Sequence, residues 1–340
     1  MCVVKQLALF KEEIDDLICS PEFISLIDGT GYSNEILNYL KEFQTFSSKG
    51  KRIRPFLVKM GFELCNNSYD PRILLPAVSY EVFQSGILIH DDIIDRSELR
   101  RGMLSMHKKI GEEKAICIGD FGLLSAILVC THSDFPSDII QKAVCHQIKV
   151  FETTIAGQLK DIELSKKTQV NEADVIEMYH WKTAWYTAIG PLQLGAILAG
   201  ADKQLISQLY NIGYNIGIAF QIKDDIQGIF GDSVKTQKSD LSDMREGKRT
   251  ILYSHFMCHA SELNKRQFER IYGNKQSEQG DLATVRKLLK CEGTYDYSIE
   301  KCYHYIRCAI AFIDEMKIND KYKSILKELI DCICNENLKN

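Results

Sequence analysis

The sequence predicts an all-α fold, and three observations support this prediction. Proline occurs only six times in 340 residues and not once after Pro191, so long helices can run without interruption. Apolar residues recur at helical spacing, as in the stretch from Ile325 to Ile333. Runs of alternating valine, isoleucine and threonine, which would indicate strands, are scarce.

Clusters of turn-forming residues divide the chain into helical segments. They lie near residues 47–50, 65–71, 97–102, 133–137, 165–171, 200–203, 231–247 and 273–280. The helices expected between them have about 15–30 residues, longer than the usual mean of about 11–12. No low-complexity linker separates two halves. We therefore expect residues 1–340 to form one domain, a single large helical bundle around a central active-site cavity, with a smaller C-terminal subdomain as the alternative.

The composition is that of an ordinary globular protein, with 45% hydrophobic and 26% charged residues. A net charge of −4 argues against a nucleic-acid partner, because general nucleic-acid binders carry a basic excess. The twelve cysteines are scattered, and the closest pair, Cys332 and Cys334, does not have a usual zinc spacing. We expect reduced, mostly buried thiols in a cytoplasmic protein.

Neither a signal peptide nor a membrane span is expected. The short apolar stretch ending at Phe10 runs directly into charged residues. No apolar run reaches the roughly 18 residues that a span needs. Residues 188–200 form a run of only thirteen that contains Pro191 and Gln193.

Carboxylates gather at the end of an apolar stretch, in the segment from Leu88 to Asp95. Residues four apart on a helix are separated by about 40° and about 6 Å, so Asp91 and Asp95 share a face. Two such carboxylates repel each other and favour a cation. Carboxylate oxygens suit Mg²⁺, which keeps several waters and often bridges protein to phosphate. The segment therefore predicts a magnesium site.

A second acidic segment follows about 130 residues later, where Asp224 and Asp225 end the apolar stretch 212–220. Two such sites on two helices can face each other across a bundle and hold several metal ions. Basic residues occupy matching places, at 51–54, at 100–101 and at 248–249. Guanidinium and ammonium groups bind diphosphate oxygens, so the combination predicts a diphosphate substrate.

From Gly50 to about Lys248, the chain resembles the trans-isoprenyl diphosphate synthases, also called polyprenyl synthetases. The motifs that carry the resemblance are Asp91-Asp92-x-x-Asp95 with Arg100-Arg101-Gly102, then Gly157-Gln158-x-x-Asp161, Lys182-Thr183 and Phe220-Gln221-x-x-Asp224-Asp225. The resemblance implies an isoprenoid synthase type of bundle and a homodimer. It also implies a Mg²⁺-dependent prenyltransferase that condenses isopentenyl diphosphate with dimethylallyl, geranyl or farnesyl diphosphate.

The resemblance also implies roles for individual residues. Asp91 and Asp95 would ligate two Mg²⁺ ions and Asp224 a third, with Asp92, Asp161 and Asp225 supporting these ligands. The allylic diphosphate would be gripped by Arg100, Lys182, Lys238 and Lys248. Isopentenyl diphosphate would bind without metal at Gly50, Lys51, Arg54, Gln84 and Arg101. Lys182, Thr183 and Gln221 would line the reacting centre.

This division of roles agrees with the chemistry. Diphosphate leaves only when its charge is neutralised, so cations stabilise the charge that develops as the allylic C–O bond breaks. The allylic cation then alkylates isopentenyl diphosphate, and a proton is lost. Because water would quench the cation, the site must close, and residues 231–247 are candidates for a lid.

Four positions depart from the family pattern. The doubled glycine before Lys51 is a single Gly50, preceded by Lys49. Position 228 is Gly where the second motif usually ends in Asp, although Asp224 and Asp225 remain. Gln84 stands where many members have His, and either side chain can hydrogen-bond a diphosphate oxygen. Lys238 follows Gln237 where Gly is usual, which weakens its assignment.

The residues before Asp91 bear on product length, because in this family the growing chain follows that helix. Gly86 and Ile87 are not the aromatic pair of the shortest synthases. The next bulky residues, Phe83 and Tyr80, would lie roughly 12 and 16 Å below Asp91. We expect a product of about fifteen to twenty carbons, with geranylgeranyl diphosphate favoured over farnesyl diphosphate.

Two other functions remain as alternatives. A terpene cyclase would share the fold and an acidic motif but would not need the isopentenyl diphosphate site that Lys51, Arg54 and Arg101 indicate. A non-catalytic partner of an active synthase would be expected to have eroded acidic motifs, and these motifs persist. Consumption of isopentenyl diphosphate distinguishes a synthase from a cyclase, and release of diphosphate by the purified chain distinguishes an enzyme from a non-catalytic partner.

Overall fold

The computed structural model describes residues 2–28, 31–231 and 241–335, and it confirms the all-α prediction. Within this part of the chain, strands are limited to β1 (Leu99–Arg100) and β2 (Met103–Leu104), which pair antiparallel. The turn between them holds Arg101 and Gly102 in the left-handed region, at φ values of 52° and 75°.

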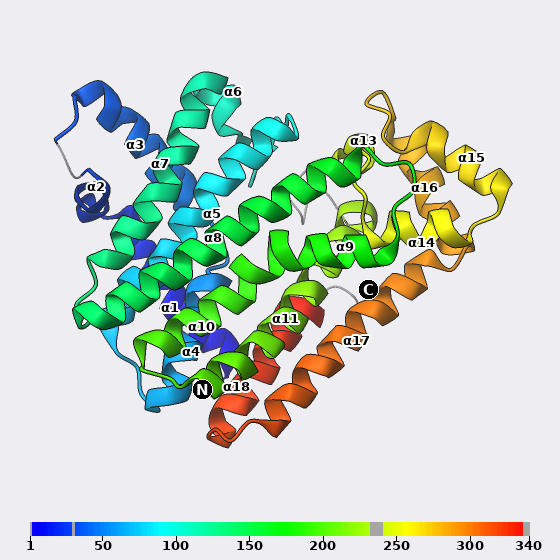
Figure 1. Cartoon of the computed structure of the whole chain (residues 1–340). Helices are drawn as coiled ribbons and strands as arrows, with labels where there is room; N and C mark the ends of the chain where they lie inside the picture. The colour runs from blue at the N-terminus through cyan, green and yellow to red at the C-terminus, as the bar shows by residue number, and fades with distance from the viewer. Residues whose placement is uncertain (1, 29–30, 232–240, 336–340) are drawn as a thin grey trace. The chain divides into compact units, whose positions relative to one another are not determined.

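Helices make up the rest of the regular structure (Figure 1). In chain order they are α1 (Val3–Cys19), α2 (Pro21–Ile27), α3 (Asn34–Ser47), α4 (Ile53–Asn66), the 3₁₀ turn η1 (Pro71–Ile73), α5 (Leu74–Ile94), α6 (Met106–Ile110), α7 (Glu112–Thr131), α8 (Ser137–Ser165), α9 (Glu172–Tyr179), the π-helix η2 (His180–Ile189), α10 (Gly190–Leu198), α11 (Lys203–Phe230), α13 (Ser242–Glu246), α14 (Ile251–His259), α15 (Glu262–Ile271), α16 (Gln279–Cys291), α17 (Thr294–Glu315), α18 (Asp320–Ile330) and the π-helical turn η3 (Asp331–Asn335).

Most predicted breaks coincide with helix ends, but further breaks, among them those at Ser20, Gly111, Ala260 and Gly293, were not predicted, and several helices are shorter than the expected 15–30 residues. At Ser20–Pro21 the chain leaves α1 and begins α2 without a spacer. The Ser20 hydroxyl accepts a hydrogen bond from the Phe23 N–H at 3.3 Å, and Pro21 takes the first helical position, where its missing N–H has no cost. A cap of two residues is easily overlooked in a search for longer turn clusters.

Contacts divide the chain into two compact units that alternate along the sequence. The first comprises residues 1–152, 186–213 and 312–329, and the second comprises residues 153–185, 214–311 and 330–340. Four of the divisions fall within α8, η2, α11 and α17. That residues 1–340 form one domain stays a prediction.

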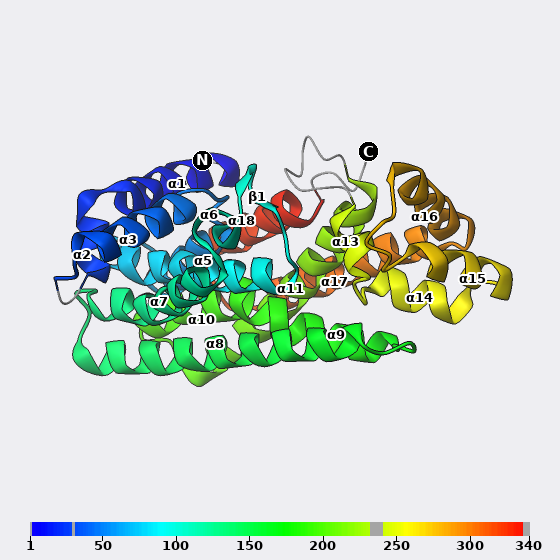
Figure 2. The same cartoon turned by 90° about the horizontal axis from the view of Figure 1, so that it is seen from above.

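In the first unit, α5 packs most extensively against α7, and both lie side by side in Figures 1 and 2. The helix α4 packs against α10 (Figure 1). Small residues permit the close approach. A Cβ atom at Gly86 would lie 2.8 Å from the Gly119 carbonyl oxygen, and one at Gly61 only 2.0 Å from that of Leu192. Both crossings therefore need glycine.

In the second unit, α14, α15 and α16 lie together in both views (Figures 1 and 2), and α14 also contacts α9. Aromatic side chains fill this region. Phe268 stacks on Tyr272 with ring centroids 4.6 Å apart, and Phe256 lies 4.5 Å from Phe268. These rings bury a large apolar area in the second unit.

Two helical segments, Pro71–Ile94 and Glu112–Thr131, are long and apolar enough to cross a membrane by length and composition alone. Core helices of globular proteins meet the same criterion, and 67% of the tested window in the first is buried. The finding is weak, and the expectation that no segment spans a membrane stays untested. All twelve cysteines lie among the described residues, and none forms a disulfide. The expectation that most are buried is wrong, because only Cys130, Cys302 and Cys334 are buried.

Candidate active site

The first acidic motif lies at the C-terminal end of α5. The helix ends in a Schellman motif, because Arg96 adopts the left-handed conformation at φ 55° and the Ser97 N–H donates to the Asp92 carbonyl at 2.9 Å. The Asp95 N–H donates to the Asp91 carbonyl at 2.8 Å, so these two residues occupy one turn and share a face, as predicted. Both side chains are half-buried. The helix dipole adds negative charge at this end, and the site therefore favours a cation.

Asp92, the middle carboxylate, is fully buried and bound to Arg100. The Arg100 Nε and Nη2 atoms both donate to Asp92 Oδ1, the former at 2.8 Å, while Asp92 Oδ2 has no hydrogen-bond partner. Burial raises the pKa of Asp92, and the Arg100 charge opposes the rise. Burial disfavours the charged form of Arg100, but the hydrogen bonds and charge of Asp92 outweigh it and raise the pKa of Arg100. Arg100 Nη2 also lies 3.8 Å from Asp91, so Asp92 holds a guanidinium beside the predicted metal ligand.

A group of arginines surrounds Gly50 in the first unit. A Cβ atom at Gly50 would lie 3.2 Å from both Arg52 Nη1 and Glu81 Oε2, and 3.7 Å from Arg101 Nη2. Burial lowers the pKa of Arg101; the charge of Glu81 opposes this effect, and the charges of Arg52, Arg54 and Arg100 add to it. A buried guanidinium among other guanidinium groups gains from an anion, so this group fits a diphosphate.

Arg54 belongs to the same group and is 7% exposed. Its Nη2 atom donates to the Thr187 hydroxyl at 2.9 Å and its guanidinium covers the Tyr186 ring at 4.3 Å, whereas its Nε atom has no partner. A buried, unpartnered donor on a cation indicates an anionic ligand. The other residues predicted for isopentenyl diphosphate differ in exposure: Lys51 is exposed, and Gln84 is half-buried on α5.

Arg52 and Glu81 are the functional residues of this region that sequence reasoning did not assign. Arg52 is 1% exposed and donates to Glu81 at 2.5 Å, to Asp15 at 2.7 Å and to the Ser47 carbonyl. Its three partners fix the loop that carries Gly50 and Lys51. The signal that could have revealed the pair is Glu81, a lone acidic residue in the apolar stretch before Asp91.

The second acidic motif lies near the C-terminal end of α11, in the second unit. Asp224 is exposed, and Asp225 is buried. Tyr179 donates its hydroxyl hydrogen to Asp225 Oδ2, and Gln221 Nε2 donates to Asp225 Oδ1 at 2.8 Å. Burial raises the pKa of Asp225 to about 8, with the charges of Asp224 and Asp243 adding to the rise and the two hydrogen bonds opposing it. An uncompensated acidic end of this kind favours a cation.

These contacts extend into a hydrogen-bonded chain. The Thr183 hydroxyl donates to Gln221 Oε1 at 2.6 Å, and the backbone N–H of Ile251 donates to the Tyr179 hydroxyl oxygen at 2.8 Å. Thr183 and Gln221 therefore lie together, as expected for residues lining one centre. Tyr179 was not predicted, and a single tyrosine in a helix gives no sequence signal.

Lys182 pairs with Asp161, its Nζ atom 2.5 Å from Asp161 Oδ2. Lys182 and Thr183 lie in the π-helix η2, which was not predicted. Glycines on two helices account for its position, because Cβ atoms at Gly157 and Gly217 would lie 2.1 Å from the Lys182 nitrogen and 2.3 Å from the Ala184 Cα. π-helical segments are rare and frequent at functional sites. The first glycine of the Gly157-Gln158 motif thus admits the backbone that carries Lys182.

Lys248 lies just after α13, its Nζ atom 3.1 Å from Asp243 Oδ1 and 3.1 Å from Glu246 Oε2. Lys238, the other lysine predicted for the allylic diphosphate, lies outside the described residues, as does much of the candidate lid.

The residues predicted to set product length form two groups. Phe83 is fully buried and stacks on Phe151 of α8, with ring centroids 3.5 Å apart, and the Tyr80 ring meets Phe151 edge-on at 6.1 Å. Gly86 instead faces α7, as described above, and Ile87 is half-buried. Phe151 was not predicted, because its partner on α5 lies far away in the sequence.

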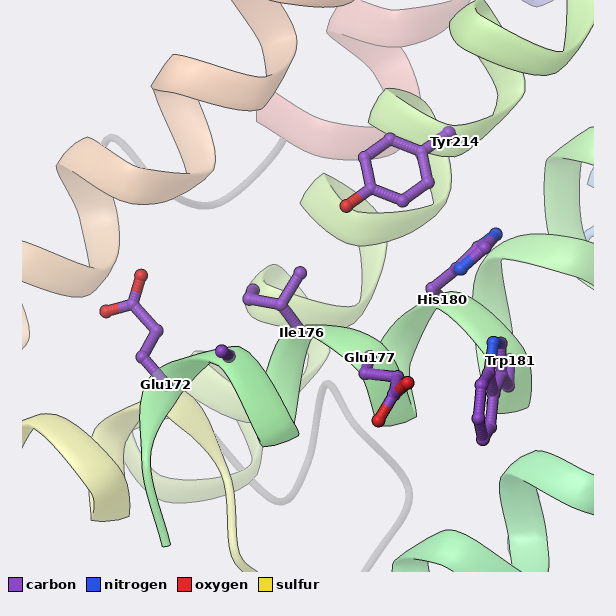
Figure 3. Close-up of a pocket in the computed structure, with 7 residues that line it drawn as sticks. Glu172, Ile176, Glu177, His180, Trp181 and Tyr214 are labelled. Carbon is purple, nitrogen blue, oxygen red and sulfur yellow. The ribbon is translucent and has the colours of Figure 1, made fainter.

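An open pocket of about 610 Å³ lies at α9 and η2 (Figure 3). Glu172, Ile176 and Glu177 line it from α9, with His180 and Trp181 from η2 and Tyr214 from α11. It contains none of the predicted metal ligands. Its two carboxylates are already paired, Glu172 with Lys301 at 2.5 Å and Glu177 with Lys160 at 2.6 Å.

The donors present fit Mg²⁺ bound together with substrate. Among the described residues, no three His, Cys, Asp or Glu side chains form a ready metal cage. Asp91, Asp95 and Asp224 supply hard oxygen donors at two helix ends, where Mg²⁺ would complete its octahedron with waters and diphosphate oxygens. The unpartnered Oδ2 atom of Asp92 is one more oxygen acceptor beside the first pair.

Helical bundling, acidic helix ends and buried arginines define a class of protein, the all-α enzymes that act on diphosphates. The family model described as polyprenyl synthetase matches residues 35–289, more than half of the chain. The chain belongs to the polyprenyl synthetase family and is a prenyltransferase.

Relatives and solved structures agree with this assignment. The geranylgeranyl diphosphate synthase of Saccharolobus solfataricus is 31% identical over 281 residues, which cover 82% of this chain and 84% of that protein. The (2E,6E)-farnesyl diphosphate synthase of Mycobacterium bovis is 30% identical over 284 residues, covering 82% and 78%. A crystal structure of geranylgeranyl pyrophosphate synthase from Corynebacterium glutamicum, complexed with isoprenyl diphosphate and magnesium, matches with a TM-score of 0.89 and 27% identity over 96% of this chain and 99% of that one. The predicted isoprenoid synthase type of fold is thereby confirmed.

Proposed function

We propose that this enzyme condenses isopentenyl diphosphate with an allylic diphosphate, head to tail, and releases inorganic diphosphate. One observation carries the proposal. This member of the family combines acidic helix ends, which favour cations, with a buried arginine group, which favours an anion. A terpene cyclase would have no use for the second feature.

The residues divide the work between the two substrates. We assign Gly50, Lys51, Arg54, Gln84 and Arg101 to isopentenyl diphosphate, where the cations bind its oxygens without metal. Arg100, Lys182, Lys238 and Lys248 are assigned to the allylic diphosphate, whose leaving-group charge they stabilise.

Asp91, Asp95 and Asp224 would hold three Mg²⁺ ions, which neutralise the diphosphate charge and thereby assist ionisation. The magnesium in the Corynebacterium structure supports the choice of metal. Asp92 orients Arg100 beside Asp91, and Asp225 is held in place by Tyr179 and Gln221. Thr183 and Gln221, which are hydrogen-bonded to each other, are assigned to the lining of the reacting centre.

The preferred product is geranylgeranyl diphosphate, with farnesyl diphosphate as the alternative. Relatives at 31% and 30% identity are named for the twenty-carbon and fifteen-carbon products, so identity alone does not decide. Phe83 lies before the first acidic motif on the same helix, α5, and its ring stacks on Phe151 of α8. This stacked pair would block a growing product chain. We assign the end of the product chain to this pair.

The assay uses the purified chain, Mg²⁺, radiolabelled isopentenyl diphosphate and each of dimethylallyl, geranyl and farnesyl diphosphate. Chromatography of the dephosphorylated products should show twenty carbons as the longest abundant product. If the chain consumed allylic diphosphate without incorporating label, a cyclase would be indicated. If it released no diphosphate with any starter, it would be a non-catalytic partner.

Phe83→Ala tests the product stop, with Ile87→Ala as a control on the same helix. We expect the Phe83 variant to yield products at least five carbons longer, because removing one ring opens the stack. An unchanged product length in the variant would refute a stop at Phe83.

We also propose a homodimer in the cytoplasm. In α7, Leu124 is 75% and Leu128 37% exposed, one turn apart on a helix that is otherwise strongly apolar. A second copy would cover this face. Sedimentation should show twice the chain mass for the wild type, and Leu124→Glu should yield the monomer. The free thiols are consistent with a reducing compartment.

A further inference from the structure

Position 228 is glycine where the second motif of the resembled family usually ends in aspartate, and another carboxylate occupies the space beside it. Gly228 lies on α11, one turn after Asp224. A Cβ atom built there would lie 1.8 Å from Asp243 Oδ2 and 2.8 Å from Asp243 Cγ. The carboxylate of Asp243 is therefore seated on the bare backbone of Gly228, and any side chain at 228 displaces it.

The same carboxylate holds Lys248. Asp243 Oδ1 lies 3.1 Å from the Lys248 Nζ atom, and the Asp243 side chain is only 13% exposed. One oxygen thus faces α11 while the other faces the ammonium. The carboxylate links the end of the second acidic motif to a lysine that the proposed function assigns to the allylic diphosphate.

Both ends of this link are fixed by contacts that do not involve the Asp243 side chain. Arg286 donates to the carbonyls of Ile229 at 2.5 Å and Gly231 at 3.0 Å, which secures the end of α11. The Tyr272 hydroxyl donates to the Lys248 carbonyl at 2.8 Å. The backbone would therefore keep its course if the carboxylate were removed, while the Lys248 ammonium would lose one of its carboxylate partners and keep Glu246 Oε2 at 3.1 Å.

We infer that Asp243 is a positioning residue: seated on Gly228, it replaces the third carboxylate that the second acidic motif lacks and holds the Lys248 ammonium in place for the allylic diphosphate. The inference rests on the proposed function. An aspartate at 228 would displace the Asp243 carboxylate, so glycine at this position is a condition for the contact.

The primary test is calorimetric titration of the full chain with inorganic diphosphate in Mg²⁺, which needs no turnover. Asp243→Asn keeps the shape but removes the charge, and we expect binding about tenfold weaker. Steady-state kinetics should show a matching rise in KM for the allylic substrate and a smaller change in KM for isopentenyl diphosphate. Glu269→Gln, an exposed carboxylate on α15, serves as the control and should bind as the wild type does.

Gly228→Ala is a second, independent variant. Alanine in a helix interior normally raises stability relative to glycine. Here its methyl group should push Asp243 aside and weaken binding as much as Asp243→Asn does. Unchanged binding with a raised melting temperature would overturn the inference.

A double-mutant cycle tests whether Asp243 acts through Lys248. Lys248→Met should weaken binding by at least as much as Asp243→Asn, and the double variant should be no weaker than Lys248→Met alone. Additive losses would contradict the positioning role. If wild-type protein failed to bind diphosphate with Mg²⁺, the proposed function itself would fail, whereas normal wild-type binding that neither variant changes would refute only this inference.

Discussion

The two acidic motifs share an Asp-Asp pair but differ in how the buried carboxylate is supported. At the end of α5, the buried middle carboxylate, Asp92, is bound by a charged partner, Arg100. At the end of α11, the buried carboxylate, Asp225, is bound by the neutral groups of Tyr179 and Gln221. Its charge is consequently less well compensated, and burial raises its pKa to about 8. The second aspartate of the same Asp-Asp pair is thus part of an ion pair at the end of α5 and is hydrogen-bonded to neutral groups at the end of α11.

The largest expected effect concerns what the two motifs share. Asp91→Asn and Asp224→Asn each remove a carboxylate from a helix end that favours a cation. We expect each to reduce kcat on the order of a hundredfold to a thousandfold, because leaving-group charge would be stabilised less well. Initial rates at saturating Mg²⁺ measure this. A loss at one motif with none at the other would mean that only the first or only the second serves the reaction.

Substitutions of the two buried carboxylates, Asp92 and Asp225, should distinguish the motifs most clearly. Asp92→Asn leaves Arg100 buried beside a neutral group, and we expect a loss of about 3 kcal/mol in the free energy of unfolding. Asp225→Asn replaces a carboxylate whose charged form burial already disfavours, and in metal-free protein we expect a change below about 1 kcal/mol. Urea unfolding in the presence of a chelator compares them. Equal losses would show that the two supports are not different in kind.

Tyr179→Phe gives a smaller effect on the second motif alone. It removes the hydroxyl that donates to Asp225 and accepts from the Ile251 N–H. We expect about 1–2 kcal/mol less stability, the usual result of leaving buried hydrogen-bonding groups without a partner. Phe256→Tyr, which adds a hydroxyl elsewhere in the same buried region, would report how much of the effect reflects packing. No change in Tyr179→Phe would remove Tyr179 from the account of Asp225.

Much of the fold and part of the site could be predicted from the sequence. The absence of proline after Pro191 and the helical spacing of apolar residues indicate helices because these features act locally. The placement of Asp91 and Asp95 on one turn follows from helical geometry in the same way. Arg100 was found because it follows a recognisable motif.

The rest depends on contacts between residues far apart in the sequence. Phe151 contacts Phe83 only because α8 packs on α5. Asp243 of α13 lies against Gly228 of α11, although the two residues belong to different helices. The π-helix that carries Lys182 arises where Gly157 and Gly217 let backbones approach closely, which no local propensity encodes. Gly228 is the clearest example. The absence of a side chain at this position of the second acidic motif is what allows the Asp243 carboxylate of α13 to lie against it.

The most direct test of the whole account is the stoichiometry of the reaction catalysed by the purified chain. Labelled isopentenyl diphosphate and farnesyl diphosphate would be supplied with Mg²⁺, and both label incorporation and released inorganic diphosphate would be measured over time. Head-to-tail condensation predicts one diphosphate released for each isopentenyl unit incorporated, with both processes abolished by a chelator and in Asp91→Asn. Diphosphate release without incorporation, or no release at all, would contradict the proposed function.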